Sequence, residues 1–387
     1  MRAVPSPARA EAVHFNYAGA GVPSPEVLDR MRHYLELETS LGPYEAEAAH
    51  GEAVVAATRA ALAGLLGAEP SGVALFDNAT RAWTTLVGNL PLRAGDEVWV
   101  SAYDYVGNLF HLAELRRRLG LRIVVMPCTP RGDVDLDWIA AHLTDDVALV
   151  SVSHLPSCCG VVVDVAAIGA LLRGSRALFV VDGCQAVGNV EVDVTAIGAD
   201  IYTGAGRKFL RGPRGTGFAH VSDRYLALAA PAVLDVHAMT VSPALDAKPL
   251  VEDATSLELA ERNIAVWAGL GVAVAEDQAR DATERRQTAE LFADLERQVC
   301  ALPGLRRLGE ASRRSGTVSV CSDRRPVTEL YARLRERGIR TWVGHGAHTP
   351  LFAPGQGADE FLRISMGRGT TTAEVDLLVH ALTDLTE

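Results

Sequence analysis

The sequence predicts an α/β fold in which a larger domain, built on a seven-stranded and mostly parallel sheet, precedes a smaller C-terminal α/β domain. Three observations support this prediction. Seven short apolar runs alternate with helical patterns over residues 70–221, most of these runs lack polar alternation, and the pattern changes after about residue 250. Continuous Val, Ile and Leu runs are typical of strands buried on both faces, and strands separated by helices are typical of parallel βαβ units.

The strands of the larger domain are expected in chain order at 73–76, 97–101, 122–127, 147–153, 177–182, 201–203 and 217–221. The helices between them are expected at 79–88, 109–119, 136–143 and 165–172. A long helical stretch at 256–274, running on through 276–299, leads to strands at 317–321, 341–343 and 361–365 and to helices at 327–337 and 372–386. The threonines at 370–372 before Glu374 suit a helix N-cap with an acidic first turn.

These elements divide the chain into four parts. An N-terminal arm is expected at 1–20, the large domain at 21–255, a linking helix at 256–290 and the small domain at 291–387. A length of 387 residues agrees with two or three domains of about 150 residues each.

Composition and charge narrow the possible partners and the compartment. A net charge of −11 and a pI near 5.5 argue against nucleic acid or an acidic membrane, because both attract basic surfaces. Residues 1–10 hold no continuous apolar stretch and no later segment is long and apolar enough to span a membrane, so a cytoplasmic protein is expected. The six cysteines lack paired CxxC spacing, and the adjacent Cys158 and Cys159 are expected to be buried thiols.

One lysine and one aspartate carry the strongest chemical prediction. Lys208 follows the strand at 201–203 in a glycine-bounded turn, and Asp182 ends the strand at 177–182, three residues before Gln185. Pyridoxal phosphate needs a lysine that holds its aldehyde as a Schiff base and a carboxylate that keeps its ring nitrogen protonated. A single such residue is more often a surface lysine or a strand-end cap, so the prediction of this cofactor depends on the two together.

Other polar groups follow the carboxyl ends of neighbouring strands, where open α/β sheets bind ligands. Asn78, Ala79 and Thr80 begin a helix, so they form either a plain helix cap or a phosphate site made of N–H groups and a hydroxyl. Tyr105 is either an ordinary loop tyrosine or a ring that stacks on a planar cofactor. Asn108 follows the same strand as Tyr105, at 97–101, whereas His154 and Ser157 follow the strand at 147–153.

Three segments resemble the class V, cysteine-desulfurase-like branch of the fold-type I pyridoxal phosphate enzymes, and the resemblance extends from about residue 14 to the end. They are Asp182-Gly-Cys-Gln185, Gly206-Arg-Lys-Phe-Leu-Arg-Gly-Pro-Arg-Gly-Thr-Gly217 and Asn16-Tyr-Ala-Gly-Ala-Gly21. The resemblance implies that Lys208 binds the cofactor, that Asp182 pairs with its ring nitrogen and that Gln185 bonds its ring oxygen. It places Tyr105 at the stacking position, which is usually a histidine.

The resemblance also implies roles for residues elsewhere in the site. Arg363 matches the arginine that grips the substrate α-carboxylate in a bidentate pair. Arg207 stands where the family has a histidine and supplies charge near the phosphate held by Ala79 and Thr80. The other implied contacts are with the cofactor, from His154, Ser157 and Asn263, and with the substrate, from Ala20, Asn108 and His345. The protein is expected to be a homodimer with shared active sites, and Asn263 lies in the region that relatives contribute to the partner's site.

One departure from the family pattern narrows the expected reaction. Desulfurases carry a persulfide-forming cysteine in a segment similar to Gly-His-His-Cys-Ala-Gln-Pro, whereas this chain has Gly344-His-Gly-Ala-His-Thr-Pro350 with Ala347 at the sulfur position. Cleavage of a carbon–sulfur bond by β-elimination needs no protein thiol. The chain also resembles actinobacterial C–S lyases of ergothioneine and lincosamide-type antibiotic pathways, which implies a β-lyase that converts a cysteine S-conjugate to a thiol, pyruvate and ammonia.

Three alternatives compete with the β-lyase. An aminotransferase, or a decarboxylating or oxidative deaminase, would use the same cofactor to break a different bond. A non-catalytic scaffolding protein is disfavoured because Lys208, Asp182, Gln185 and Arg363 are all retained. A metal hydrolase built on His345, His348 and His154 is disfavoured because no carboxylate accompanies these histidines at a metal-binding spacing, so no metal is expected.

Overall fold

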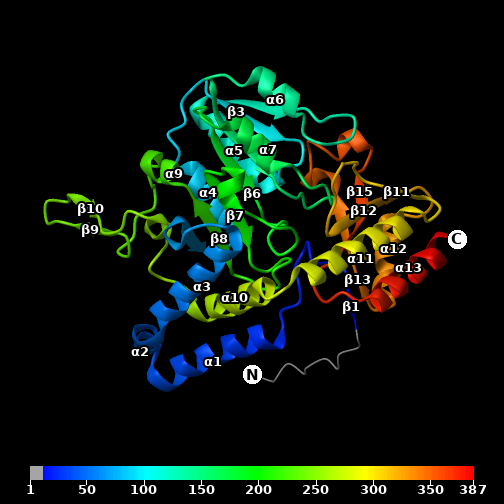
Figure 1. The fold of residues 1–387 in the computed structure, drawn as a ribbon, viewed down its shortest axis with the longest axis horizontal. Helices are drawn as coiled ribbons and strands as arrows, with labels where there is room; N and C mark the ends of the chain where they lie inside the picture. The colour runs from blue at the N-terminus through cyan, green and yellow to red at the C-terminus, as the bar shows by residue number, and fades with distance from the viewer. Residues whose placement is uncertain (1–11) are drawn as a thin grey trace.

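A computed structural model describes residues 12–387, in which a seven-stranded sheet and a four-stranded sheet form the centres of the two domains, beside two two-stranded pairings (Figure 1). Part of the predicted N-terminal arm and the segment inspected for a leader lie in residues 1–11, outside the described residues. The larger sheet has the strand order β2-β8-β7-β6-β5-β3-β4. Its strands are β2 (Val73–Phe76), β3 (Glu97–Ser101), β4 (Arg122–Met126), β5 (Val147–Ser153), β6 (Leu178–Asp182), β7 (Ile201–Ala205) and β8 (Gly217–Val221).

The larger sheet is mostly parallel, which confirms the predicted fold class. Strands β4, β3, β5, β6 and β7 pair in parallel, whereas β8 runs antiparallel to both β7 and β2. In this register Ser153 lies beside Asp182, and Asp182 lies beside Thr203. The carboxyl ends of β5, β6 and β7 therefore meet at one edge of the sheet, where a ligand site is expected.

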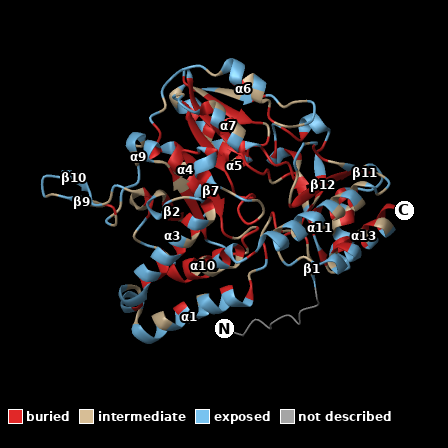
Figure 2. Cartoon of the chain, in the orientation of Figure 1, coloured by how far each residue is buried: buried red, intermediate tan, exposed pale blue. Residues whose placement is uncertain are grey.

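Helices cover both faces of the larger sheet, so its strands are buried while the outer faces of the helices are exposed (Figure 2). One face packs against α4 (Ala79–Gly88), α5 (Val106–Leu119) and α9 (Asp223–Leu228). The other packs against α3 (Glu52–Leu66), α6 (Leu136–His142), α7 (Val165–Leu172) and α10 (Ile264–Gln278). Burial on both faces explains why the strand sequences lack polar alternation.

The smaller sheet is antiparallel, with the order β11-β12-β15-β14. Its strands are β11 (Leu305–Arg307), β12 (Thr317–Ser322), β15 (Glu360–Ser365) and β14 (Trp342–His345), and they pack against α11 (Ala282–Cys300), α12 (Val327–Glu336) and α13 (Thr372–Thr386). Thr371 and Glu374 form a capping box at the start of α13, which confirms the predicted N-cap. The N-terminal strand β1 (Val13–His14) pairs with β13 (Ile339–Arg340), so the start of the described chain attaches to this domain.

The prediction of one long helical stretch over 256–299 is wrong. Helix α10 begins only at Ile264, after the cap residue Asn263, and ends at Gln278. A second helix, α11, begins after Asp281, whose side chain accepts a hydrogen bond from the N–H of Glu284. An aspartate that caps a helix in this way competes with continuation of the preceding helix. Helix α10 packs on α3 and on α1 (Pro25–Leu41), whereas α11 packs on α13. The predicted domain boundaries stay a prediction.

The sequence did not predict α1, α3 or the hairpin of β9 (Met239–Val241) and β10 (Ala247–Pro249), which projects from the large domain (Figure 1). Within residues 12–387, no helix combines the length and the apolar character needed to cross a membrane.

Candidate active site

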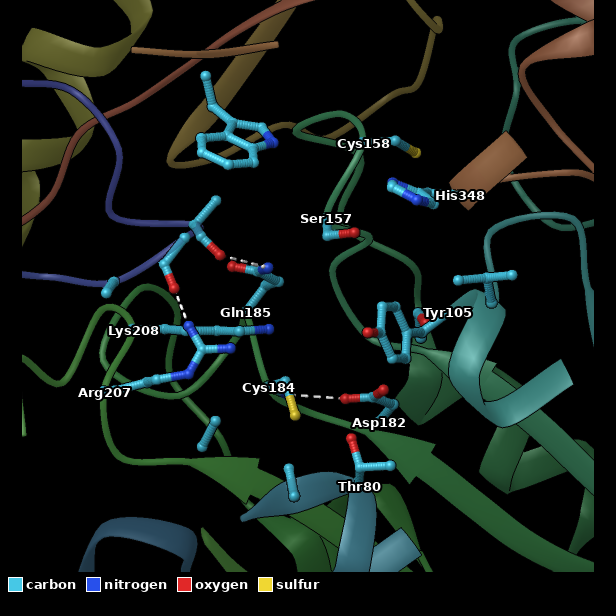
Figure 3. Close-up of a pocket in the computed structure, with 18 of the residues that line it drawn as sticks. Thr80, Tyr105, Ser157, Cys158, Asp182, Cys184, Gln185, Arg207, Lys208 and His348 are labelled. Carbon is cyan, nitrogen blue, oxygen red and sulfur yellow. Dashed lines mark hydrogen bonds between the residues drawn. The ribbon is translucent and has the colours of Figure 1, made fainter. Parts of the chain in front are cut away.

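A cavity of about 780 Å³ lies where the carboxyl ends of the parallel strands face the small domain. Every site residue predicted from the sequence lines it except His154 and Asn263. The predicted residues that line it are Ala20, Ala79, Thr80, Tyr105, Asn108, Ser157, Asp182, Gln185, Arg207, Lys208, His345 and Arg363. In Figure 3, Thr80 lies at one end of the view and Cys158 and His348 lie at the other, with Lys208, Gln185, Asp182 and Tyr105 between them.

Asp182 occupies the end of β6 and is nearly fully buried. Its Oδ2 accepts a hydrogen bond from Asn108 Nδ2 at 2.9 Å, and its Oδ1 accepts one from the backbone N–H of Cys184 at 3.0 Å. These two bonds come from α5 and from the turn after β6, and they fix the plane of the carboxylate. Asn108 therefore positions Asp182, a role that differs from the predicted substrate contact.

Lys208 lies in a tight turn between β7 and β8. The N–H of Arg211 donates to the Lys208 carbonyl at 2.9 Å, and Arg211 takes the left-handed conformation (φ 63°) that closes this turn. Gly21 packs so close that a Cβ at that position would lie 2.5 Å from the Lys208 oxygen. The Lys208 side chain extends into the cavity on the side opposite Tyr105 (Figure 3).

The surroundings of Lys208 lower the pKa of its side chain. Burial lowers the pKa of Lys208, and the weaker opposing influences of Cys184 and Asp182 do not reverse this shift. Among residues 12–387, the Nζ atom of Lys208 forms no hydrogen bond or ion pair. A lysine in this setting is available for covalent chemistry with a carbonyl group.

The N-terminus of α4 forms one end of the cavity. Asn78 caps the helix by accepting a hydrogen bond from the N–H of Arg81 at 2.9 Å, which confirms the predicted helix cap. Within the described chain the N–H groups of Ala79 and Thr80 have no partner, and both residues line the cavity. Arg207 and Arg214 line the same cavity, and burial lowers the pKa of Arg207. Free N–H groups at a helix start beside two cations suit a phosphate.

Tyr105 lies at the start of α5 and remains partly exposed in the cavity. A Cβ at position 107 would lie 2.6 Å from a carbon of the Tyr105 ring, so a larger residue than Gly107 would displace this ring. Tyr105 and Lys208 face the space between them from opposite sides (Figure 3). This placement supports the predicted stacking role.

Arg363 projects from β15 and is a deeply placed cation without a carboxylate partner among the described residues. Its Nη1 donates to the Ser157 carbonyl at 3.0 Å and its Nη2 donates to Asn16 Oδ1 at 3.1 Å, while its buried Nε has no partner. Burial lowers the pKa of Arg363 to about 10, and Cys158 acts in the opposite direction. The Ser157 carbonyl therefore positions the arginine, and the unpaired charge favours an anionic ligand.

The loop that follows β14 also lines the cavity, through His345, His348 and Thr349. The rings of His345 and His348 contact each other edge to face at a centroid distance of 5.7 Å. His345 Nδ1 lies 3.4 Å from Glu360 Oε1. Ala347 is exposed and is absent from the residues that line the cavity.

The predicted cofactor contact of His154 is wrong. His154 is buried behind the strand end, where its Nδ1 is hydrogen-bonded to the Tyr202 hydroxyl at 2.9 Å. It lines a different cavity, between α7 and α11. Burial lowers the pKa of His154 to about 4, with a smaller contribution from Arg313 in the same direction. His154 follows Ser153 directly in the chain, and successive residues of a strand point to opposite sides.

Asn263 does not reach this cavity in its own subunit. Its side chain caps α10 by accepting a hydrogen bond from the N–H of Val266 at 3.2 Å. A contact of Asn263 with the cofactor of a partner subunit stays a prediction. The metal-hydrolase alternative loses its basis because His154 is separated from His345 and His348, and within residues 12–387 no group of three or more His, Cys, Asp or Glu side chains could hold a metal ion.

Sequence reasoning missed a buried carboxylate next to the site. Asp104 accepts hydrogen bonds from Ser101 Oγ at 2.6 Å, from Ser151 Oγ at 2.8 Å and from the N–H of Ser153 at 3.1 Å. Burial raises the pKa of Asp104 to about 7, although the two serine hydroxyls lower it and Asp182 raises it further. Asp104 ties β3 to β5 beside Asp182, and its position directly before Tyr105 was the only signal in the sequence.

The lining residues fit pyridoxal phosphate. Lys208 is available for the aldehyde, and Asp182 is fixed to pair with the ring nitrogen. Gln185 donates through Nε2 to the Ala18 carbonyl at 3.1 Å, which leaves its buried Oε1 without a partner and facing the same cavity. A buried acceptor without a donor is costly, so a ligand hydroxyl at this place would satisfy it.

A family model described as "Aminotransferase class-V" matches residues 13–378 of the chain. The chain belongs to the class-V aminotransferase family. A probable cysteine desulfurase of Xylella fastidiosa (strain 9a5c) is 30% identical over 333 residues, which cover 84% of this chain and 79% of that protein. A cysteine desulfurase of Klebsiella pneumoniae (strain 342) is 28% identical over 346 residues, covering 86% and 83% respectively.

Solved structures show the same fold. A cystine C–S lyase in complex with its reaction product, cysteine persulfide, superposes with a TM-score of 0.87 at 22% identity and covers 97% of this chain and 98% of its own. The resemblance predicted from the sequence is thus confirmed at the level of the family. The protein is a cysteine-desulfurase-like enzyme of this family, and pyridoxal phosphate is its cofactor.

Proposed function

We propose that the protein is a β-lyase that cleaves the carbon–sulfur bond of a cysteine S-conjugate and releases a thiol, pyruvate and ammonia. The observation that carries this proposal is the loop 344–350, which faces the site but holds Ala347 where persulfide-forming desulfurases have their cysteine. The groups that bind the cofactor and the substrate carboxylate are retained. The same loss of the thiol agrees with the resemblance to actinobacterial C–S lyases of ergothioneine and lincosamide-type antibiotic pathways.

Two other thiols line the cavity, and neither is suited to replace the missing nucleophile. The hydrogen bond to Cys159, together with burial, raises the pKa of Cys158 well above its ordinary value, and the two sulfurs lie 3.7 Å apart. Burial and the neighbouring Asp182 raise the pKa of Cys184 in the same way. Because the thiolate is the reactive form, both cysteines are poor acceptors of a substrate sulfur.

The cofactor and the protein contribute different parts of the proposed reaction. When bound, pyridoxal phosphate supplies an electron-accepting ring that stabilises negative charge on the substrate α-carbon. Lys208 would hold its aldehyde carbon and Asp182 its ring nitrogen, while Gln185 would bond the ring oxygen. The start of α4, with Arg207, would hold the phosphate.

The side chains of the site bind the substrate and move its proton. Arg363 pairs with the α-carboxylate and thereby fixes the α-carbon relative to Lys208. The lowered pKa of Lys208 increases the fraction of neutral amine, which accepts the α-proton. The electron pair left on the α-carbon then forms a double bond to the β-carbon, and the sulfur leaves with the electrons of the broken bond and takes up a proton to give the thiol. Water hydrolyses the released 2-aminoacrylate to pyruvate and ammonia. Asp182 keeps a proton on the ring nitrogen throughout.

A panel of cysteine S-conjugates tests this proposal, with pyruvate and free thiol as the measured products. A β-lyase releases both in equal amounts without a second substrate. An aminotransferase would release no thiol and would form the keto acid of the conjugate only when an acceptor keto acid is added, and a decarboxylating enzyme would release carbon dioxide. The last two outcomes would each contradict the proposal.

The Lys208→Ala variant tests the cofactor chemistry separately. The purified wild type is expected to be yellow, and the variant is expected to lose both the colour and turnover. A wild-type protein that stays colourless after pyridoxal phosphate is added would contradict the assigned role of Lys208.

A further inference from the structure

The wall of the cavity that the small domain supplies is one face of a two-stranded ribbon. Strands β14 and β15 pair antiparallel, with Trp342 opposite Arg363 and Gly344 opposite Phe361. All four residues line the cavity. Val343 and Leu362, which alternate with them, lie instead in the core of the small domain. The indole of Trp342 and the guanidinium of Arg363 therefore share one face as direct cross-strand neighbours.

This face carries one exposed and one buried aromatic side chain. Trp342 is 47% exposed and is the only tryptophan among the large exposed apolar side chains of residues 12–387. A Cβ on residue 344 would lie 2.1 Å from a ring carbon of Phe361, so Gly344 makes room for this phenyl ring, which is only 2% exposed. The paired rings of His345 and His348 continue the wall beyond the end of β14.

We propose that Trp342, Gly344 and Phe361 form a subsite for a flat, apolar or aromatic group carried on the sulfur of the substrate. This inference rests on the proposed β-lyase function, because it defines the substituent of the S-conjugate. An amino acid whose carboxylate binds Arg363 has its own side chain within reach of the next residue across the ribbon, since such pairs have Cβ atoms about 5 Å apart. A methyl group on the sulfur leaves the indole uncovered, whereas an aryl ring packs on it.

Substrate preference gives the first test. The kcat/KM for pyruvate release from S-benzylcysteine is compared with that from S-methylcysteine. The wild type is expected to favour the benzyl conjugate, and Trp342→Ala is expected to lower kcat/KM for that conjugate by about 10-fold while changing the methyl conjugate by less than about 3-fold. Trp342→Phe keeps an aromatic face and is expected to restore most of the preference. Leu377→Ala is a matched control in the same domain, because Leu377 on α13 is 46% exposed and lies outside the cavity.

An equal loss for both conjugates in Trp342→Ala would overturn the inference, because a general structural role would produce it. A wild type that favours the methyl conjugate would also overturn it.

A binding measurement separates this inference from the proposed reaction. S-benzyl-α-methylcysteine lacks an α-proton, so it binds without turnover, and S-methyl-α-methylcysteine serves as the small counterpart. The benzyl analogue is expected to change the fluorescence of exposed Trp342 and to bind at least about 10-fold more tightly than the methyl analogue. If no conjugate yields pyruvate but this binding preference is found, the reaction is wrong and the subsite stands. Equal binding of the two analogues would overturn the subsite whatever the reaction.

Discussion

At the scale of single residues, Arg363 shows how the chain prepares for a charged ligand. Two of its nitrogens are fixed by neutral acceptors, the Ser157 carbonyl and Asn16 Oδ1, so its charge is left uncompensated in the cavity. Asn16 reaches this position because residues 15–18 run along the end of β15, where the N–H of Ala18 donates to Ser365 Oγ at 2.9 Å. A carboxylate that enters the cavity would compensate the charge of the Arg363 guanidinium, which burial has deprived of water.

The Arg363→Ala variant is expected to bind amino-acid substrates roughly 10- to 100-fold more weakly, because hydrogen bonds to charged groups contribute about 1.5–3 kcal/mol. The absorption spectrum of the bound cofactor is expected to remain that of the wild type. Titration with substrate, followed by absorbance, measures both quantities. Arg363→Lys keeps the charge but not the bidentate geometry, so an intermediate affinity is expected. Loss of the cofactor spectrum in Arg363→Ala would show that the arginine holds the cofactor instead.

His154 predicts a dependence of stability on pH. Its folded pKa of about 4 lies below the ordinary value of 6.5, so the unfolded state binds the proton first as the pH falls. The free energy of unfolding is therefore expected to decrease between about pH 6.5 and pH 4, by up to about 1.4 kcal/mol per pH unit from this group. Denaturant unfolding across this range, compared between the wild type and His154→Gln, isolates the contribution. The glutamine retains an acceptor for the Tyr202 hydroxyl.

The matched control for that comparison is His380→Gln, because His380 is exposed on α13. It is expected to retain the pH dependence of the wild type. Parallel curves for the wild type and His154→Gln would contradict the assigned burial of the neutral imidazole.

At the scale of elements, the junction of β8 with α4 sets the position of the phosphate site. A Cβ on Gly217, at the start of β8, would lie 2.3 Å from the Asn78 carbonyl carbon and 2.6 Å from the Ala79 nitrogen. Gly217→Ala is therefore expected to displace the start of α4 and to weaken affinity for pyridoxal phosphate at least about 10-fold, as measured by equilibrium binding. Gly355→Ala is the control, because a Cβ there meets nothing within 4 Å. Unchanged affinity in Gly217→Ala would place the phosphate elsewhere.

Strands were easier to predict than helix ends or side-chain directions. The strands at 73–76, 97–101, 147–153 and 217–221 agree with the structure because a short, continuous apolar run between polar turns has few other interpretations. The break at 279–281 was missed because both flanking segments are helical in pattern, and only the cap formed by Asp281 separates them.

Within the site, the sequence predicted the residues whose role follows from the chemistry of their side chain. It did not predict correctly the residues whose role depends on the direction in which the side chain points. Lys208, Asp182 and Arg363 were found because their chemistry is specific. His154 was placed in the site wrongly because the pleat of the strand decides which side of the sheet its side chain faces. Trp342 was missed because the register between β14 and β15 decides that it lies opposite Arg363. Register between two strands that are separated by the 14 residues 346–359 is a tertiary property.

At the scale of the whole molecule, the active site depends on how the two domains meet. Asp182 comes from the large sheet and Lys208 from the turn between its strands β7 and β8, whereas Arg363 and Trp342 come from the small sheet. The N-terminal segment bridges them, because β1 pairs with β13 while the Ala18 carbonyl accepts from Gln185. A shift of one domain relative to the other would therefore change the distance between Arg363, which is proposed to bind the substrate carboxylate, and Lys208, the proposed base.

The exposed apolar side chains of the large domain predict where a second subunit binds. Seven of them lie on and around the β9–β10 hairpin, which projects from the domain (Figure 1): Leu228, Val233, Leu234, Val236, Val241, Leu245 and Leu250. Val236 is 76% exposed and Val241 is 60% exposed. Exposed apolar side chains that lie close together in one segment favour an interaction site, and a second copy of the chain is the partner that we predict.

The wild type is therefore expected to sediment in analytical ultracentrifugation as a dimer with twice the 41.2 kDa mass of the chain. The double variant Val236→Glu and Val241→Glu is expected to shift this mass toward that of the monomer, because charges at a buried apolar contact are strongly unfavourable. Leu377→Glu, which adds one charge to an exposed apolar position of the small domain, is expected to leave the dimer intact. A monomeric wild type would contradict the predicted homodimer, whereas a double variant that remains dimeric would place the interface on another face of the molecule.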